Sequence, residues 1–410
     1  MRTGQWAGSG DQVADAVVIG GGTVGGWCAW WLRQAGLERV AVVERSTLGR
    51  GASSRAAGMV RSQGGTPAAV RLGMWSRDFY LRQSEELGVD SGFVAQGYFM
   101  PAFSQGEVAV GRARVAMQRE LGLDVFWLEG DDVASVNPTM AASCCLGGSY
   151  AAGDGYLDPP RNVLAYAVAL ARAGVSLRER TEFCGLRVSA AGAVTGVATS
   201  GGTIATERVV LTGGPDLASV GRIAGVTVHA GGTRHQVAVT EPHPAFSPEV
   251  MGAMVFDLPN GLYWRPEDGG LLFGMSNPDE PPGPARDVDW PYLETMRSRL
   301  AELVPLSAGL ALRRVWAATI DYTSDHLPIL GPALGPDGPL VGVTVASAGG
   351  HGMMWGPAVA RVAADLALGL ETTVIDDVGS LGLDRFDAEG NSRLDPDPIA
   401  LPFPERTALS

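Results

Sequence analysis

The segment VVIGGGTVGG, residues 17–26, constrains the fold of this chain more than any other. Three glycines in the spacing Gly20-x-Gly22-x-x-Gly25 follow an apolar strand and open a helical pattern over Thr23–Ala35. The first glycine permits a tight turn, the second lets a diphosphate approach the backbone, and the third lets the helix pack on the strand. The helix N-terminus offers N–H groups and a partial positive charge to that diphosphate. The segment therefore predicts a β-α-β unit that binds a dinucleotide.

A carboxylate and a long loop complete this unit. The next strand, Val40–Glu44, ends in a carboxylate that should accept hydrogen bonds from ribose hydroxyls, and we expect the adjacent Arg45 to bind the cofactor as well. The loop that follows, ERSTLGRGASSRAAGMVR (44–61), is rich in small residues whose backbone N–H groups can lie along an FAD molecule. An NAD domain would usually continue straight into a helix, and the sequence has no second GxGxxG for a nicotinamide partner. We therefore expect FAD.

Periodicity along the rest of the chain predicts a mixed α/β (α+β) fold. Helices are expected at 67–87, 106–121, 290–303 and 356–368, and a loop that enters a helix, with Pro159 and Pro160 near its first turn, at 155–174. Hairpin-like strands are expected at 176–214, further strands over 227–280, and a strand at 339–345. Pieces typical of a cofactor domain alternate with β-rich pieces. We therefore predict a Rossmann-type FAD-binding domain (1–90, 151–225 and 321–387) interleaved with a β-rich substrate domain (91–150 and 226–320). A loose leader over 1–14 and an irregular tail over 388–410 are also expected.

Composition excludes several classes of function. The net charge of −13 argues against a nucleic-acid partner. The sequence contains no lysine, so all 31 basic residues are arginines and every catalytic role that needs a lysine is excluded. The four cysteines show neither metal-ligand spacing nor a disulfide framework, although a vicinal Cys144–Cys145 disulfide stays open. Free thiols, the lack of a signal sequence and the lack of a membrane-spanning apolar run predict a cytoplasmic protein without a membrane partner.

Four blocks of the sequence resemble the D-amino acid oxidase superfamily, in its glycine oxidase, sarcosine oxidase and dimethylglycine dehydrogenase branch. They are VVIGGGTVGG; ERSTLGRGASSRAAGMVR; GYLDPPRNVLAYAVALARAG with RTEFCGLRV and VVLTGG; and WAATIDYTSDHLPILGP with ASAGGHGMMWGPAVARVAADLALG. The resemblance implies an FAD domain and a large sheet that covers the flavin. It also implies oxidation of a C–N bond next to a carboxylate, with hydride transfer to flavin N5 and an imine product.

The resemblance also suggests which residues touch the cofactor. The loop that passes the flavin ring matches Ser53, Ser54, Arg55 and Ala56, and the strand that holds the adenine matches Phe183. The VVLTGG block contributes Gly213. The loop before the last helix, which faces the flavin pyrimidine, matches Gly349, Gly350, His351, Gly352 and Met353. Covalent attachment is not expected, because Ala317 stands where sarcosine oxidases have a cysteine and the 44–61 loop lacks a histidine.

The expected substrate pocket departs further from sarcosine oxidase. Arg61 matches the carboxylate-binding arginine, and Tyr263 matches a pocket tyrosine. Other family positions are replaced: Leu272 stands at the oxygen-activating lysine, Ser276 at a pocket histidine and Met354 at a second carboxylate-binding lysine. The pocket should therefore be less basic and more apolar. Further candidates for its lining are Trp264, Arg265, Trp316 and Asp321.

These observations predict an FAD-dependent amine or amino-acid oxidoreductase, with Arg61, Tyr263 and His351 as the candidate catalytic residues and without a metal site. Two alternatives stay open. A 2-hydroxy-acid oxidase or dehydrogenase would need a base, so His235, His326 or His351 would have to reach the substrate. A flavin-carrying subunit of a larger dehydrogenase complex would pass electrons to a partner. The sequence leaves open the substrate, the electron acceptor and the oligomeric state.

Overall fold

The computed structural model describes residues 12–141, 144–336 and 338–399. A six-stranded sheet forms the centre of one half of the molecule, in the order β19-β20-β13-β2-β3-β9. Its strands are β2 (Ala16–Ile19), β3 (Val40–Val43), β9 (Ser176–Arg178), β13 (Val209–Leu211), β19 (Ile329–Gly335) and β20 (Gly338–Ser347). All pairs are parallel except β19 with β20. The predicted β-α-β unit, formed by β2, α1 (Thr23–Gln34) and β3, therefore lies within a parallel sheet.

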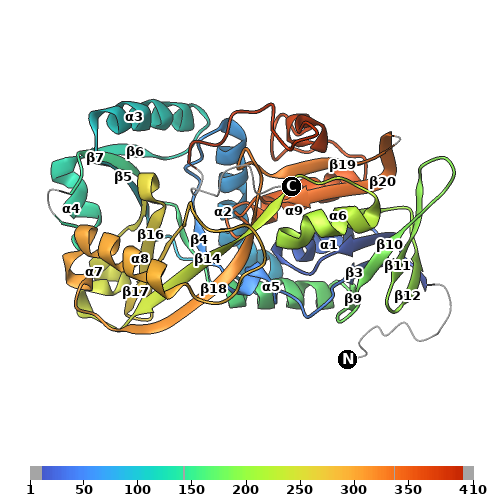
Figure 1. Ribbon diagram of the computed structural model, residues 1–410, viewed down its shortest axis with the longest axis horizontal. Helices are drawn as coiled ribbons and strands as arrows, with labels where there is room; N and C mark the ends of the chain where they lie inside the picture. Colours follow the sequence, from blue (N-terminus) through green and yellow to red (C-terminus); the bar gives the residue numbers. More distant parts are fainter. Residues whose placement is uncertain (1–11, 142–143, 337, 400–410) are drawn as a thin grey trace.

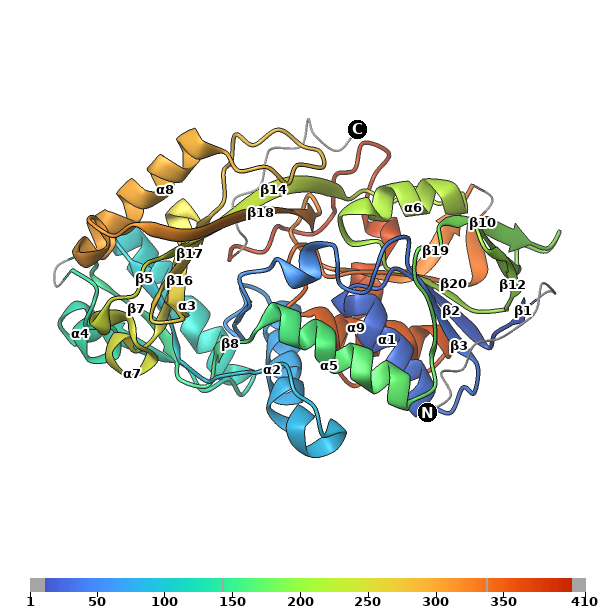
Figure 2. The ribbon, with the colours of Figure 1, turned by 90° about the horizontal axis from the view of Figure 1, so that it is seen from below.

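Alternating burial explains why this sheet carries a layer on each face. Val18 and Val42 pack in one apolar cluster with the helices, whereas their neighbours Val17 and Ala41 pack in a second cluster on the opposite face. A strand buried on both faces reads as a continuous apolar run, as β2 does. The helices on the first face are α1 (Thr23–Gln34), α2 (Pro67–Leu87), α5 (Pro159–Arg172) and α9 (Gly356–Ala367) (Figure 2).

A small four-stranded sheet and α6 (Leu217–Ala224) cover the other face. The small sheet has the order β1-β12-β11-β10, formed by β1 (Gln12–Val13), β10 (Phe183–Val188), β11 (Val194–Thr199) and β12 (Gly202–Ala205). The hairpins predicted over 176–214 are thus β10 to β12, while β9 and β13 belong to the parallel sheet. Of the leader expected over 1–14, residues 1–11 lie outside the described part, and Gln12 and Val13 pair with β12.

An eight-stranded sheet, β18-β14-β17-β16-β15-β5-β7-β6, fills the other half of the molecule (Figure 1). It takes strands from two separate stretches of the chain: β5 (Tyr98–Ala102), β6 (Phe126–Glu129) and β7 (Gly147–Ala151), then β14 (Gly231–Thr240), β15 (Met254–Asp257), β16 (Leu262–Glu267), β17 (Gly270–Met275) and β18 (Leu312–Tyr322). All pairs are antiparallel except β15 with β5. A two-stranded ladder joins β4 (Met59–Val60) to β8 (Gly155–Tyr156).

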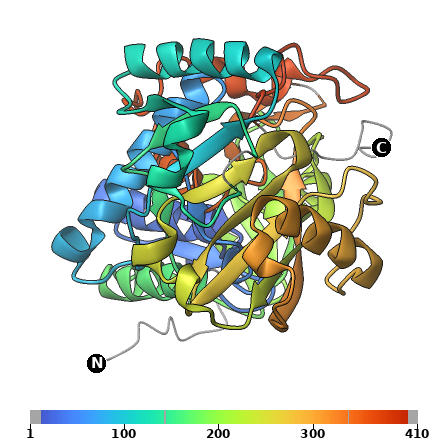
Figure 3. The same cartoon turned by 90° about the vertical axis from the view of Figure 1, so that its left-hand side faces the viewer.

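The two faces of this sheet have different roles. Alternate residues such as Trp264 and Phe273 pack against α8 (Trp290–Leu303), which lies on the outer face (Figure 3). Tyr263 and Leu272 belong to another apolar cluster on the inner face. Shorter helices α4 (Val133–Val136) and α7 (Pro248–Met251), and α3 (Gln105–Glu120), surround the sheet. The predicted mixed α/β fold class is confirmed.

Local sequence signals explain where the main helices begin. Thr66 accepts a hydrogen bond from the Ala69 N–H at the start of α2, and Asp158 accepts one from the Arg161 N–H at the start of α5. A proline follows each cap directly, where its missing N–H costs nothing. All six predicted long helices are present within a few residues of their expected ends.

Candidate functional site

One cavity, of about 900 Å³, lies where the two halves meet. Its lining combines the carboxyl ends of β2 and β3, the 44–61 loop, the start of β10 and the segment before α9 with the inner face of β14, β16 and β18. In Figure 2, β14 and β18 extend from the eight-stranded sheet toward this edge of the parallel sheet. Ligands of open parallel sheets bind at the carboxyl ends of the strands, so this cavity is the candidate site.

The glycine turn has the geometry that its spacing predicts. Gly20 has φ +106°, and a Cβ there would lie 2.7 Å from the Thr212 carbonyl oxygen. A Cβ on Gly25 would lie 1.9 Å from the Gly20 carbonyl oxygen, so α1 can approach β2 only with glycine at this position. Gly25 is not part of the cavity lining, whereas Gly20 and Gly22 are. The turn thus presents backbone at the start of a twelve-residue helix, where N–H groups lack helical partners.

Glu44 and Ser53 hold the loops around this helix start. The Glu44 carboxylate accepts hydrogen bonds from the Gly21 N–H at 2.8 Å and the Ser46 N–H at 2.7 Å. The Ser53 hydroxyl accepts one from the Thr23 N–H at 3.0 Å. Both side chains line the cavity, so these polar atoms lie where the dinucleotide was predicted.

The structure brings most of the predicted cofactor residues to one cavity. Its lining includes Gly20, Gly22, Glu44, Arg45, Ser53, Arg55, Ala56, Phe183, Gly213, Gly350, Gly352 and Met353. Three predicted residues are not among the lining: Gly25, Ser54 and Gly349. Ser54 ends a short 3-10 turn, and Gly349 has φ +53° in the turn before His351. Their positions make them part of the support for the lining.

Arg61 lines the cavity but is already hydrogen-bonded within the protein. Its side chain is 3% exposed and donates to the Gln63 carbonyl oxygen and, at 2.6 Å, to the Ile399 carbonyl oxygen. The guanidinium carbon lies 5.7 Å from the centre of the Phe256 ring. A buried guanidinium favours an anion, and the two bonds leave further N–H groups for one.

Tyr263 forms a pair with His235, a residue that the sequence suggested only as a base for hydroxy acids. The tyrosine hydroxyl lies 2.6 Å from His235 Nε2, and both side chains line the cavity. Burial lowers the pKa of His235 to about 4 and raises that of Tyr263, so both groups are neutral at pH 7. The rings are stacked, with centroids 5.6 Å apart.

A glycine on the intervening strand permits this pair. β17 lies between β14 and β16, and Gly274 pairs with Val237 on one side and Tyr263 on the other. A Cβ on Gly274 would lie 2.2 Å from the Tyr263 hydroxyl oxygen. The tyrosine therefore crosses β17 only because residue 274 has no side chain. This feature requires knowledge of strand order and could not be found in the sequence.

His351 also lines the cavity and is neutral. Burial, followed by the positive charge of Arg61, lowers its pKa to about 3. Its Nδ1 lies 2.9 Å from the Gly349 carbonyl oxygen. A carbonyl only accepts, so Nδ1 carries the proton and Nε2 is left as an acceptor. His326, the third histidine considered, is not part of the lining.

Several candidates for the pocket lie elsewhere. Leu272 and Ser276 are buried in β17 and just beyond it, outside the lining. Trp264, Arg265, Trp316 and Ala317 also lie outside the lining. Arg265 pairs with Glu267 at 2.6 Å, and Trp316 donates to the Arg55 carbonyl oxygen. Met354 and Asp321 do line the cavity, and Asp321 accepts a hydrogen bond from Ser347.

The predicted residue Arg55 belongs to a group of arginines on the lining, and sequence reasoning missed its two neighbours Arg50 and Arg286. Arg50, Arg55 and Arg286 line the same cavity, and burial together with the charges of Arg286 and Arg50 lowers the pKa of Arg55. Arg45, by contrast, pairs with Asp216 at 2.5 Å. This side of the cavity is positive although the chain as a whole is acidic, which suits a ligand that carries phosphates.

The residues present fit FAD. A glycine turn without room for a Cβ at Gly20 or Gly25, a helix N-terminus, the Glu44 carboxylate and an arginine-lined wall share a cavity large enough for a dinucleotide and a small substrate. Over residues 12–141, 144–336 and 338–399, the structure has neither a metal-ligand cluster nor a helix with the length and apolarity to cross a bilayer. The four cysteines are free.

Comparison with known proteins agrees with this geometry. The family described as FAD dependent oxidoreductase (DAO) matches residues 15–366. Glycine oxidase of Geobacillus kaustophilus is 32% identical over 327 residues, covering 77% of this chain and 84% of that protein. The formaldehyde-forming 4-methylaminobutanoate oxidase of Paenarthrobacter nicotinovorans is 26% identical over 92% of this chain, but the match spans only 46% of that longer protein.

Among solved structures, L-proline dehydrogenase from P. horikoshii superposes with a TM-score of 0.84 at 25% identity, covering 92% of this chain and 98% of that one. The family match extends over most of the chain, from the first strand of the glycine turn to the last helix. The resemblance noted in the sequence and the expected FAD cofactor are therefore confirmed, and the chain belongs to the family of FAD-dependent oxidoreductases.

Proposed function

We propose that this enzyme, which oxidises a C–N bond as its relatives do, acts on an amine or amino acid that binds between Arg61, Tyr263 and His351. The observation that carries the proposal is the meeting of these three side chains with the glycine turn in one cavity. When bound, FAD supplies the oxidant, which accepts a hydride from the carbon next to nitrogen. The product is an imine.

The chain's own groups bind and orient the substrate. Arg61 binds a carboxylate through the N–H groups that its two internal bonds leave free. Tyr263 and His235, both neutral, hold the amine nitrogen by a hydrogen bond, and His351 Nε2 offers an acceptor on another side. The apolar lining at Phe256 keeps water away from the reacting carbon.

Anaerobic reduction of the flavin tests this function. The purified protein is mixed with a panel of N-methyl amino acids, primary amino acids, cyclic imino acids and amines without a carboxylate, and bleaching of the flavin absorbance is followed. We expect bleaching by at least one compound of these classes. Tyr263→Phe serves as a matched variant that retains the ring and removes the hydroxyl, and it should bleach more slowly with normal flavin content.

Oxidation of a 2-hydroxy acid is the second candidate, since His235 and His351 both line the cavity. Including lactate, glycolate and 2-hydroxyglutarate in the panel separates the two. Bleaching by a hydroxy acid but not by its amino-acid counterpart would contradict the C–N assignment. The low pKa values of both histidines favour the amine, because a hydroxyl needs a base to take its proton.

We further propose a non-covalent FAD, a cytoplasmic location and the division into interleaved FAD and substrate domains given above. The free cysteines support a reducing compartment. The eight-stranded sheet, built from 98–151 and 231–322, supports the division. Acid precipitation should release all the flavin into the supernatant, and flavin in the pellet would contradict non-covalent binding.

A further inference from the structure

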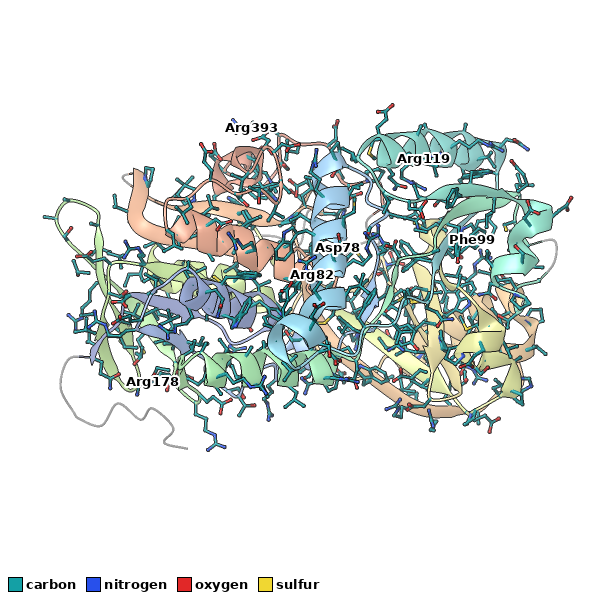
Figure 4. All side chains as sticks on the ribbon, turned by 180° about the vertical axis from the view of Figure 1, so that it is seen from behind. Asp78, Arg82, Phe99, Arg119, Arg178 and Arg393 are labelled. Atoms are coloured by element: carbon teal, nitrogen blue, oxygen red, sulfur yellow. The ribbon has the colours of Figure 1, made fainter. Side chains whose placement is uncertain are left out.

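The last described residues form a segment, Arg393–Ile399, that we call the C-terminal strap. It contains neither helix nor strand, yet it is fixed at its base. The Arg393 N–H donates to the Arg385 carbonyl oxygen, and Arg385 forms a buried ion pair with Asp325 at 2.7 Å. The Asp397 N–H donates to the Asp325 carbonyl oxygen at 3.0 Å. Arg393 lies on the same edge of the molecule as Arg119 of α3 (Figure 4). The irregular tail expected from 388 is thus packed up to residue 399.

From this base the strap extends into the apolar side of the candidate site. Ile399 is fully buried. It packs in one cluster with residues that also line the cavity, namely Met59, Tyr98, Val237, Phe256 and Tyr263. Its carbonyl oxygen accepts a hydrogen bond from Arg61 Nη2 at 2.6 Å. The end of the described chain therefore touches the guanidinium to which we assign the substrate carboxylate.

The strap also brings an acidic side chain near this guanidinium. Asp397 is 3% exposed, and its Oδ1 accepts a hydrogen bond from the Ile399 N–H at 2.8 Å. Within the described part of the chain, its Oδ2 has no hydrogen-bond partner. Burial raises the pKa of Asp397, while Arg61 acts against this rise and favours the carboxylate. Arg61 thus has a carbonyl acceptor and a nearby carboxyl group, both supplied by the strap.

We propose that the C-terminal strap is an intramolecular competitor for Arg61, which an anionic substrate displaces when it binds. The proposal rests on the assignment of Arg61 to the substrate carboxylate. A substrate carboxylate makes a charge-assisted, bidentate bond, which is stronger than the bond to the neutral Ile399 carbonyl. The strap therefore yields to an anion but stays in place against a neutral molecule of the same shape. Its anchor at Asp325 and Arg385 remains while the end moves.

Carboxylate binding by a shortened chain tests the competition. The chain ending at Asp395 lacks the competing residues, whereas a control chain ending at Pro402 retains them with an ordinary peptide bond after Ile399. Calorimetric titration compares cyclohexanecarboxylate with its neutral amide in the FAD-loaded proteins. We expect the carboxylate to bind at least tenfold more tightly to the chain ending at Asp395 than to the control, and the amide to bind within twofold in both.

Three results would overturn the proposal. These are an unchanged carboxylate affinity, an equal gain for the carboxylate and the amide, or a gain that persists when Arg61→Ala is added to the chain ending at Asp395. An equal gain would make the strap a steric wall. These titrations do not require turnover, so their outcome is separate from the anaerobic test of C–N oxidation.

Two measurements on the full-length chain guard against misfolding of the shortened one. Ile399→Gly retains the carbonyl but removes the buried side chain, so it should also raise carboxylate affinity, while unchanged affinity contradicts the proposal. Hydrogen exchange of peptides covering 393–399 should rise when cyclohexanecarboxylate binds to the unaltered protein. Unchanged or slower exchange in this segment would show that the strap stays on Arg61.

Discussion

Two buried neutral histidines should make this protein sensitive to mild acid. The pKa values of His235 and His351 are lowered from 6.5 to about 4 and about 3, mainly by burial. Between these values and 6.5 the unfolded chain binds more protons than the native one. The free energy of unfolding therefore falls as pH falls from about 6.5, and this loss stops below the native pKa of each histidine.

The magnitude follows from the shifts. As the pH falls from about 7.5 to 5, it passes roughly 1.5 pH units below the unfolded pKa of 6.5. At about 1.4 kcal/mol per unit, each histidine then lowers the free energy of unfolding by about 2 kcal/mol. The perturbation is His235→Gln, which does not titrate and retains a hydrogen-bonding group for Tyr263. Over this pH range the free energy of unfolding should fall by about 2 kcal/mol less in the variant than in the unaltered protein. Adding His351→Asn should reduce this fall by about 2 kcal/mol more.

Urea unfolding at the two pH values, with FAD at one saturating concentration, measures this difference. Comparison between variants is essential because burial raises the pKa values of Asp154 and Asp397. These two carboxyl groups raise the free energy of unfolding as the pH falls, and so oppose the effect of the histidines. This opposing contribution cancels between the variant and the parent. If His235→Gln shows the same loss as the parent, His235 is not buried in its neutral form and the account of the pair with Tyr263 is wrong.

Three further predictions follow from the site. Gly274→Ala places a Cβ at 2.2 Å from the Tyr263 hydroxyl, so it should separate this hydroxyl from His235. Flavin reduction should slow about as much as in Tyr263→Phe, with FAD content unchanged, and full activity would mean that the pair is dispensable. Arg61→Ala should weaken binding of a carboxylate substrate roughly ten- to a hundredfold, equivalent to about 1.4–2.8 kcal/mol. Arg61→Lys should retain only part of this affinity, and loss of FAD in either variant would assign Arg61 to the cofactor. Because the sequence contains no lysine, reoxidation of the reduced enzyme by oxygen in stopped flow should be slower than in lysine-bearing relatives, and comparable rates would show that an arginine or histidine replaces it.

The cofactor half of this protein could be predicted from local patterns of residues. The glycine turn, Glu44 and the apolar periods around them are local features, since a positive φ or an apolar period acts within a few residues. These features predicted β2, α1 and β3 almost to the residue. They also predicted FAD, which the family match confirms.

The substrate side, by contrast, depends on contacts between residues that are far apart in the chain. Tyr263 reaches His235 across a strand because of Gly274, and strand order in an eight-stranded sheet depends on contacts between distant segments. The sequence also suggested Arg265 as a pocket residue, but its guanidinium pairs with Glu267 and donates hydrogen bonds to backbone carbonyls. Ile399 of the strap is 338 residues from Arg61 in the sequence. No periodicity or motif predicts which buried guanidinium the end of a chain will contact. Such contacts are set by packing of the whole chain, because burial and charge pairing depend on spatial neighbours that are distant in the sequence.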